Sequence, residues 1–114
     1  MPSAKTELLA GTLEMLVLKT LTVGPMHGYG IAQHLGRVSG DALRVEEGTL
    51  YPALQRMRQK GWIKAEWKQT PNNQRARYYR LTPPGRRYLT REQSRWKQLV
   101  EAVHALMHPR ALND

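Results

Sequence analysis

The segment formed by residues 47–63 constrains the fold more than any other part of this chain. Its apolar residues recur at the spacing of one helical face, as Leu50, Ala53, Leu54 and Met57. Gly61 ends this pattern, and from Trp62 onward apolar and polar residues alternate in the manner of a half-buried strand. The segment therefore predicts an amphipathic helix that leads directly into a strand.

Three further helices and a second strand are predicted around this segment. The pattern places helices at residues 8–22, 27–38, 48–60 and 84–107, and strands at residues 62–68 and 75–82. Because proline is tolerated mainly in the first turn of a helix, Pro52 indicates that the third helix begins at Gly48 or later. Thr82 is expected to cap the last helix. This order predicts a mainly α (α+β) fold, a winged helix-turn-helix over residues 1–83 with a long C-terminal dimerisation helix over residues 84–114, in one compact unit.

Two further patterns predict which side chains face the core. The second helix has an apolar stripe of Ile31, Leu35 and Val38. The first strand places one set of residues inward, namely Ile63, Ala65 and Trp67, and the other set outward, namely Lys64, Glu66 and Lys68. Trp62 and Trp67 are expected to pack the hairpin against the core.

The first and last helices carry more apolar surface than a small domain needs. The first helix is apolar on more than one side, and the last has a stripe of heptad-like spacing that a monomer would leave in water. We therefore expect a homodimer whose interface contains Leu9, Leu13, Leu16, Leu89, Trp96, Leu99, Val103 and Leu106. Trp96 is expected in the dimer core, or alternatively as one wall of a small-molecule pocket between the subunits.

The positive charge of the chain is concentrated in one region. The formal net charge is +9, but residues 55–97 contain thirteen Lys or Arg against two acidic residues, whereas the rest contains five against seven. This segregation is typical of a surface that binds a polyanion. Together with the predicted topology, it favours duplex DNA over a basic surface that is merely solvated.

Several residues are candidates for DNA contact. On the third helix, Gln55 suits adenine and Arg56 suits guanine in the major groove. On the hairpin, the side chains that suit phosphates are Lys64, Lys68, Arg75 and Arg77, and Tyr51 could donate to a phosphate near the helix start. Thr49, Pro52 and Gln59 complete the outward face of the helix.

Other classes of function find little support in the sequence. The chain has no cysteine, and no motif for a nucleophile or a phosphate-binding loop, so we expect no enzyme and no cofactor. His104 and His108 with Glu101 have the spacing of metal ligands, but other ligands are lacking, so we expect no metal site. No segment is apolar enough to be a membrane span or a secretory signal, and the lack of cysteine fits a cytoplasmic protein.

Five segments in order resemble the PadR family of transcriptional regulators. They begin at Gly11, Met26, Glu47, Gly61 and Arg77, and read GTLEMLVL, MHGYGI, EGTLYPAL, GWI and RYYRLT. Each is weakly specific alone, but all five occur in order, and the resemblance covers about residues 8–107, which is nearly the whole chain. The short C-terminal part, which consists of a single helix, resembles that of the smaller subfamily.

The resemblance implies a dimeric bacterial repressor that binds an inverted repeat near a promoter. It places a set of residues at DNA-facing positions, namely Tyr29, Thr49, Tyr51, Pro52, Lys68, Arg75 and Arg77. Multidrug-binding relatives have a tryptophan at the dimer centre, which Trp96 resembles, so an aromatic effector is an alternative. Non-specific or RNA binding, and a purely structural dimerisation module, are the remaining hypotheses.

Overall fold

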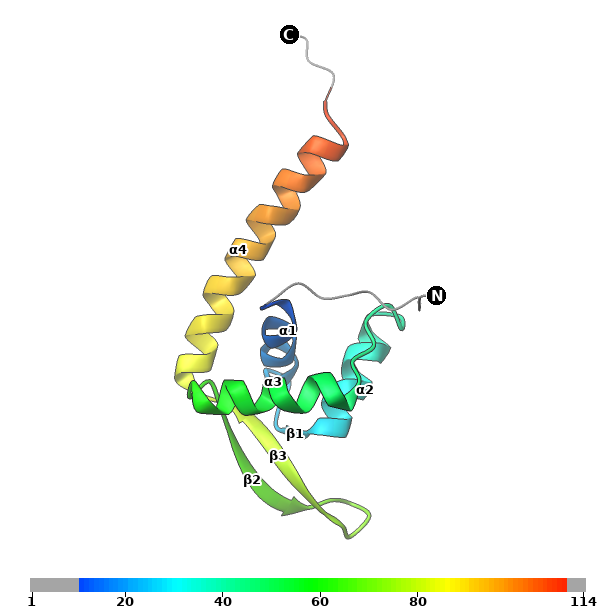
Figure 1. Ribbon diagram of the computed structural model, residues 1–114, viewed down its shortest axis with the longest axis vertical. Helices are drawn as coiled ribbons and strands as arrows, with labels where there is room; N and C mark the ends of the chain where they lie inside the picture. Colours follow the sequence, from blue (N-terminus) through cyan, green and yellow to red (C-terminus); the bar gives the residue numbers. More distant parts are fainter. Residues whose placement is uncertain (1–10, 111–114) are drawn as a thin grey trace.

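The computed structural model describes residues 11–110 as four helices and a small sheet (Figure 1). In chain order the elements are α1 (Thr12–Leu21), β1 (Met26–His27), α2 (Gly28–Val38), α3 (Glu47–Gln59), β2 (Ile63–Gln69), β3 (Arg75–Leu81) and α4 (Pro83–Met107). The predicted mixture of helices with a two-stranded wing is confirmed. Leu8 and Leu9, predicted in the first helix, lie outside the described residues.

The sheet has one strand that the sequence did not predict. The antiparallel order is β1-β3-β2, and β1 pairs Met26 with Tyr79 and His27 with Tyr78. Two residues show no alternation, so their pattern cannot predict a strand. The pairing ties the start of α2 to the middle of the wing, because His27 is both a strand residue and the residue that caps α2 by accepting from the Gly30 amide at 2.9 Å.

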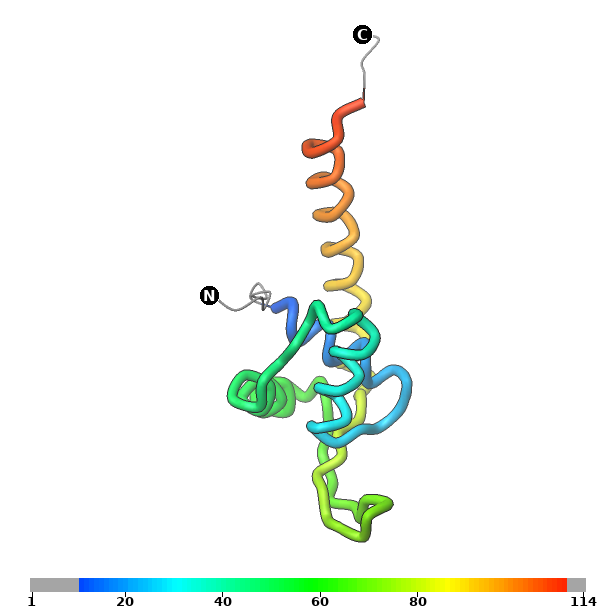
Figure 2. Tube along the Cα trace, turned by 90° about the vertical axis from the view of Figure 1, so that its right-hand side faces the viewer, coloured from blue at the N-terminus to red at the C-terminus, as the bar shows by residue number. Residues whose placement is uncertain are grey.

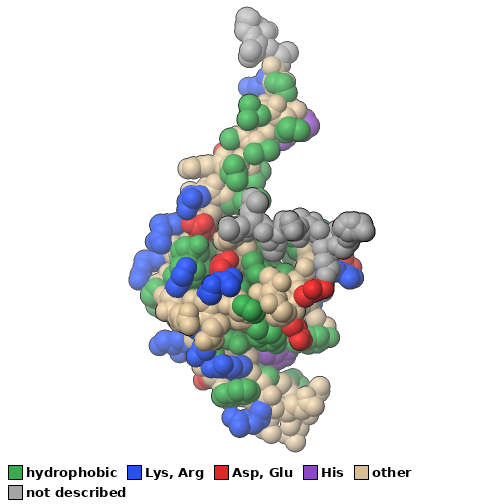
Figure 3. All heavy atoms as spheres, in the orientation of Figure 1, with side chains coloured by type: hydrophobic (Ala, Val, Ile, Leu, Met, Phe, Trp, Pro, Cys, Tyr) green, Lys and Arg blue, Asp and Glu red, His purple; other side chains and the backbone are tan. Residues whose placement is uncertain are grey.

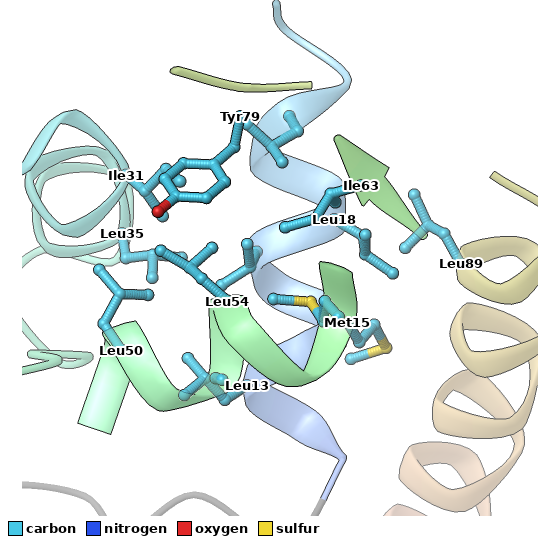
Figure 4. Packing of buried hydrophobic residues seen from close by; sticks show 14 residues of the cluster. Leu13, Met15, Leu18, Ile31, Leu35, Leu50, Leu54, Ile63, Tyr79 and Leu89 are labelled. Carbon is cyan, nitrogen blue, oxygen red and sulfur yellow. The ribbon is translucent and has the colours of Figure 1, made fainter. Parts of the chain in front are cut away.

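The core lies where α1 crosses between the other helices (Figures 2 and 4). Val17 and Leu18 of α1 are completely buried, and side chains of α2, α3, the wing and α4 surround them. The fully or nearly fully buried partners include Ile31, Leu35, Leu50, Leu54, Met57, Ile63, Tyr79 and Leu89. The apolar residues on the different sides of α1 are therefore buried largely within the protomer.

Two predicted core positions are wrong. Val38 is 69% exposed, because α2 ends at this residue and its buried stripe stops at Leu35. Trp67 is 57% exposed, because the wing extends beyond the helices after Ala65. Strand alternation thus predicted the side of the strand but not the point at which the core ends. Trp62, in contrast, packs against the core as predicted.

The start of α3 also differs from the prediction. The helix begins at Glu47, with Glu46 as its extended N-cap residue, so Pro52 lies in the second turn. The Leu50 amide donates to the Glu46 carbonyl at 2.9 Å, which fixes the first turn. Burial of Leu50, Ala53 and Leu54 then holds the helix through the one hydrogen bond that a proline removes.

Thr82 joins the wing to α4. As predicted it caps α4, because its hydroxyl accepts from the Gly85 amide at 3.1 Å, and it also donates to the Gly61 carbonyl at 2.6 Å. The Trp62 ring stacks on Tyr88 with a centroid distance of 3.7 Å. These contacts hold the start of α4 against the end of α3 and fix the direction in which α4 leaves the wing.

The elements that share the core, α1, α2, α3, the sheet and the start of α4, form the head of the molecule. The outer part of α4 projects from this head (Figures 1 and 2). The molecule measures 64 × 37 × 21 Å, and the long axis follows this helix. Of the residues predicted at the dimer interface, Leu89 of α4 and Leu13 of α1 pack in the core of their own protomer and contribute little exposed surface. Leu16 is partly buried against the same core. The exposed stripe consists of Trp96, Leu99, Val100, Val103, Leu106 and Met107.

Candidate nucleic-acid interface

The outward surface of α3 has two flanks with different partners. On one flank Arg56 forms an ion pair with Glu14 of α1, with 3.2 Å between the guanidinium nitrogen and the carboxylate oxygen. On the other flank Arg58 donates to the Gln55 side-chain oxygen at 3.1 Å, and both residues border the base of the wing beside Lys64. The predicted base-reading Arg56 therefore points toward α1, and Arg58 is the arginine beside Gln55.

Tyr51 packs across the start of α2. A Cβ at Gly28 would approach the Tyr51 hydroxyl to 2.5 Å, so the glycine makes room for this ring. Tyr51 remains 41% exposed. Burial, with a smaller contribution from the carboxylate of Glu47, raises the pKa of Tyr51 above its usual value of 10.0. The hydroxyl is thus a neutral hydrogen-bond donor at physiological pH.

Aromatic and amide side chains continue this surface onto α2. Tyr29 is exposed, and its hydroxyl accepts from the Gln33 side-chain nitrogen at 3.1 Å. The ring of His27 lies between Tyr29 and Tyr78, with centroid distances of 6.3 and 5.3 Å. Sequence analysis missed Gln33, because one polar residue on a helix carries no signal until its neighbours are known.

The wing has two faces that separate the predicted phosphate contacts. Residues opposite one another in an antiparallel pair share a face, and the register pairs Trp67 with Arg77 and Lys68 with Ala76. Arg75 and Arg77 therefore lie on the inner face, which continues from the buried residues Ile63 and Tyr79. Lys64 and Lys68 lie on the outer face, where Lys68 forms an ion pair with Glu66 at 3.6 Å.

A hollow of about 780 Å³ separates the inner face of the wing from the starts of α2 and α3. Its lining combines the aromatic residues with the inner arginines, and includes His27, Tyr29, Gln33, Tyr51, Trp67, Arg75 and Arg77. The structure thus brings together Tyr29, Tyr51, Arg75 and Arg77 of the predicted set. Thr49, Pro52, Gln55 and Gln59 are exposed on α3 outside this lining.

Basic side chains dominate one side of the molecule (Figure 3). They gather over the wing, the end of α3 and the start of α4, whereas the start of α3 carries the acidic Glu46 and Glu47. The segregation of charge along the sequence thus becomes a segregation in space. A wide basic surface of this kind attracts a polyanion before any specific contact forms.

His104 and His108 lie at the end of α4, within the described residues 11–110. Within this range no group of three or more His, Cys, Asp or Glu is arranged to hold a metal ion. The rings of His104 and His108 are tilted by 39° relative to one another, with a centroid distance of 4.8 Å. No helix of this part of the chain is long and apolar enough to cross a membrane.

A helical core, an outward helix and a flanking two-stranded wing define a winged helix-turn-helix protein. The chain belongs to the transcriptional regulator PadR-like family, whose model matches residues 17–91. It is therefore a DNA-binding transcriptional regulator. The predicted family, fold class and regulatory role are confirmed at this level.

Individual relatives agree with this assignment. A transcriptional regulator of Mycobacterium tuberculosis is 36% identical over 78 residues, which covers 68% of this chain and 69% of the relative. The crystal structure of a PadR-like transcriptional regulator from Bacillus cereus is similar with a TM-score of 0.79 and 25% identity, over 92% of this chain and 100% of that one. A PadR family regulator from Eggerthella lenta has a TM-score of 0.74 and 32% identity, over 88% and 85% of the two chains.

Proposed function

We propose that this chain is a dimeric, sequence-specific transcriptional repressor that binds an inverted repeat near a promoter. The observation that carries the proposal is the open surface formed by Tyr51 of α3 and the inner wing arginines, Arg75 and Arg77, with the exposed Gln55 four residues further along α3. Such a surface can place a helix in the major groove while the arginines contact phosphates.

In this proposal the contacts divide into base reading and positioning. Gln55, held by Arg58, pairs with a base edge, and discrimination by one such pair is worth about 1–3 kcal/mol. Thr49, Pro52 and Gln59 shape the rest of the helix surface. Tyr29 and Tyr51 donate to phosphates from the starts of α2 and α3, because both residues are exposed and line the hollow.

Dimerisation is proposed from the projecting half of α4. Trp96, Leu99 and Val103 are 41%, 47% and 48% exposed in the protomer, and they continue toward Leu106 along one stripe. An apolar stripe of this length in water favours pairing with a second copy. Two-fold symmetry would then present two α3 helices to half-sites about 34 Å apart.

Selection of bound duplexes from a random library tests this proposal. The expected result is an inverted repeat that binds about 10³-fold or more tightly than scrambled DNA at the same salt concentration. Gln55→Ala should relax the preference at one base position of each half-site and leave the others unchanged. Recovery of no preferred sequence would replace the proposal with non-specific binding.

A second candidate is a repressor that responds to a planar aromatic effector at the dimer interface. The observation that favours it is the exposure of the Trp96 ring among aliphatic side chains of α4, a surface to which flat aromatic molecules can stack. Quenching of fluorescence by such a molecule should disappear in Trp96→Phe, although Trp62 and Trp67 remain. Equal quenching in both proteins would exclude Trp96 as the site.

A further inference from the structure

Trp67 occupies an unusual place for a tryptophan. It is on the inner face of the wing, yet 57% of it is exposed, and it borders the hollow that faces the starts of α2 and α3. Burial of a tryptophan contributes more to stability than burial of most side chains. Because this ring is largely exposed, it contributes little to the stability of the core. The ring therefore acts mainly on the other side chains at the surface of the wing.

The ring contacts both arginines of the inner face. Arg77 is its partner across the strands, and the guanidinium carbon lies 5.8 Å from the ring centroid. Arg75 lies diagonally across, with its guanidinium carbon 5.3 Å from the same centroid. A tryptophan face attracts cations within about 6 Å. One ring thus holds two guanidinium groups of like charge. Without the ring, the two groups would repel one another and their side chains would adopt many rotamers.

The burial of the Arg77 Nε indicates how this guanidinium is oriented. Its Nε is buried and has no hydrogen-bond partner among residues 11–110. The donors that remain for a ligand are those of the two terminal nitrogens, whose geometry matches two oxygens of one phosphate. An arginine fixed in this way loses less side-chain entropy when it binds than a free one does.

We propose that Trp67 is a positioning residue for DNA binding, which holds Arg75 and Arg77 toward one stretch of sugar-phosphate backbone at the hollow. The inference rests on the proposed function, because it assigns the inner face of the wing to phosphate contact. Lys64 and Lys68 of the outer face have no part in it, since the pleat directs them away from the ring. The role of Trp67 is to act through the arginines rather than to touch the bases.

A double-mutant cycle on DNA affinity separates this role from direct contact. The probe is a fixed duplex of mixed sequence at low salt, so that the measurement needs no operator. Trp67→Leu should weaken binding about three- to tenfold, as expected for the loss of two exposed cation–π contacts. In a chain that already carries Arg75→Ala and Arg77→Ala, the same change should cost less than about twofold, because no cations remain to be held.

Two further variants make the cycle specific. Trp67→Phe should retain most of the affinity, because a smaller aromatic ring still attracts the guanidinium groups. Lys68→Ala on the outer face is the matched control background. In a chain that carries Lys68→Ala, Trp67→Leu should still weaken DNA binding about three- to tenfold, by the same factor as in the wild type. Thermal unfolding should show similar midpoints for all Trp67 variants, because the side chain lies largely outside the core.

The outcomes distinguish this inference from the proposed function. Equal losses for Trp67→Leu in both arginine backgrounds would show that the ring contacts DNA itself or supports the hairpin, and would overturn the positioning role. An unchanged affinity in the single variant would overturn it as well. A wild-type chain that binds no duplex would remove the proposed function and the inference together.

Discussion

The head of the molecule and the projecting half of α4 use similar side chains in opposite ways. In the head, leucines such as Leu18, Leu50 and Leu54 are almost completely buried. On α4 beyond Leu89, Leu99 is 47% exposed and Leu106 is 81% exposed. The head therefore completes its core within one chain, whereas the outer helix can bury its stripe only against another surface. The difference leaves the outer stripe of α4 available for the proposed pairing, while the head is complete without it.

The largest effect is expected from a charge on the stripe. Leu99→Glu should raise the dissociation constant of the dimer about a hundredfold or more, because pairing would bury a carboxylate without a partner. Sedimentation measures the change. Gln98→Glu, on the polar side of the same helix, is the control and should leave a dimer. If Leu99→Glu remains dimeric, the proposed interface is not on this stripe.

Removal of the inner wing arginines should have the next largest effect. Arg75→Ala combined with Arg77→Ala should weaken binding to every duplex and lower the slope of log affinity against log salt by about 1.8, for two phosphate contacts. Salt titration of a fixed duplex gives both numbers. Lys64→Ala with Lys68→Ala removes equal charge from the outer face and should change the slope less. Equal changes in the two pairs would contradict the division of the wing into two faces.

Loss of the joint between the two regions should be smaller but should affect folding. Thr82→Ala removes the cap of α4 and the bond to the Gly61 carbonyl, and should lower the free energy of unfolding by about 1–2 kcal/mol. Denaturant titration measures it. Thr90→Ala is the matched control within α4, since the Thr90 hydroxyl bonds only to the Arg86 carbonyl on an exposed surface. A loss as large in Thr90→Ala would refute the special role of Thr82.

The smallest effect is expected from Arg56. Arg56→Ala removes an ion pair with Glu14 in which the arginine side chain is 53% exposed, so the free energy of unfolding should fall by no more than about 1 kcal/mol. The sequence preference of the protein should not change, because this side chain faces α1. A relaxed base position in selected duplexes would restore Arg56 as a reader.

The limits of sequence analysis follow from the kind of contact involved. Periodicity identified the buried face of α3, because Leu50, Leu54 and Met57 pack locally in a repeating pattern. It could not locate the end of the core, and therefore misplaced Trp67 and Val38 inside. Leu89 fits the heptad spacing of α4 as well as Leu99 does. Leu89 is buried in the head because α1 packs against that part of α4, which the spacing cannot predict.

The candidate interface shows the same limit. Tyr51 and the wing arginines were expected from the sequence, and the structure places them around one hollow. Arg56 and Arg58 could not be told apart, because the side of α3 on which α1 or the wing lies depends on tertiary packing. The two faces of the wing required the register of β2 with β3, which no local pattern supplies.

The central claim is that the head of one chain binds one half-site, and that pairing through α4 lets two heads bind both half-sites together. The most direct test measures the affinity of wild-type and Leu99→Glu proteins for the selected duplex and for a single half-site of it. The wild type should prefer the complete site by at least about tenfold, the minimum expected when two linked heads bind together. Leu99→Glu should bind both duplexes with the same weak affinity. A Leu99→Glu protein that keeps the full preference, or a wild type that shows none, would contradict the claim.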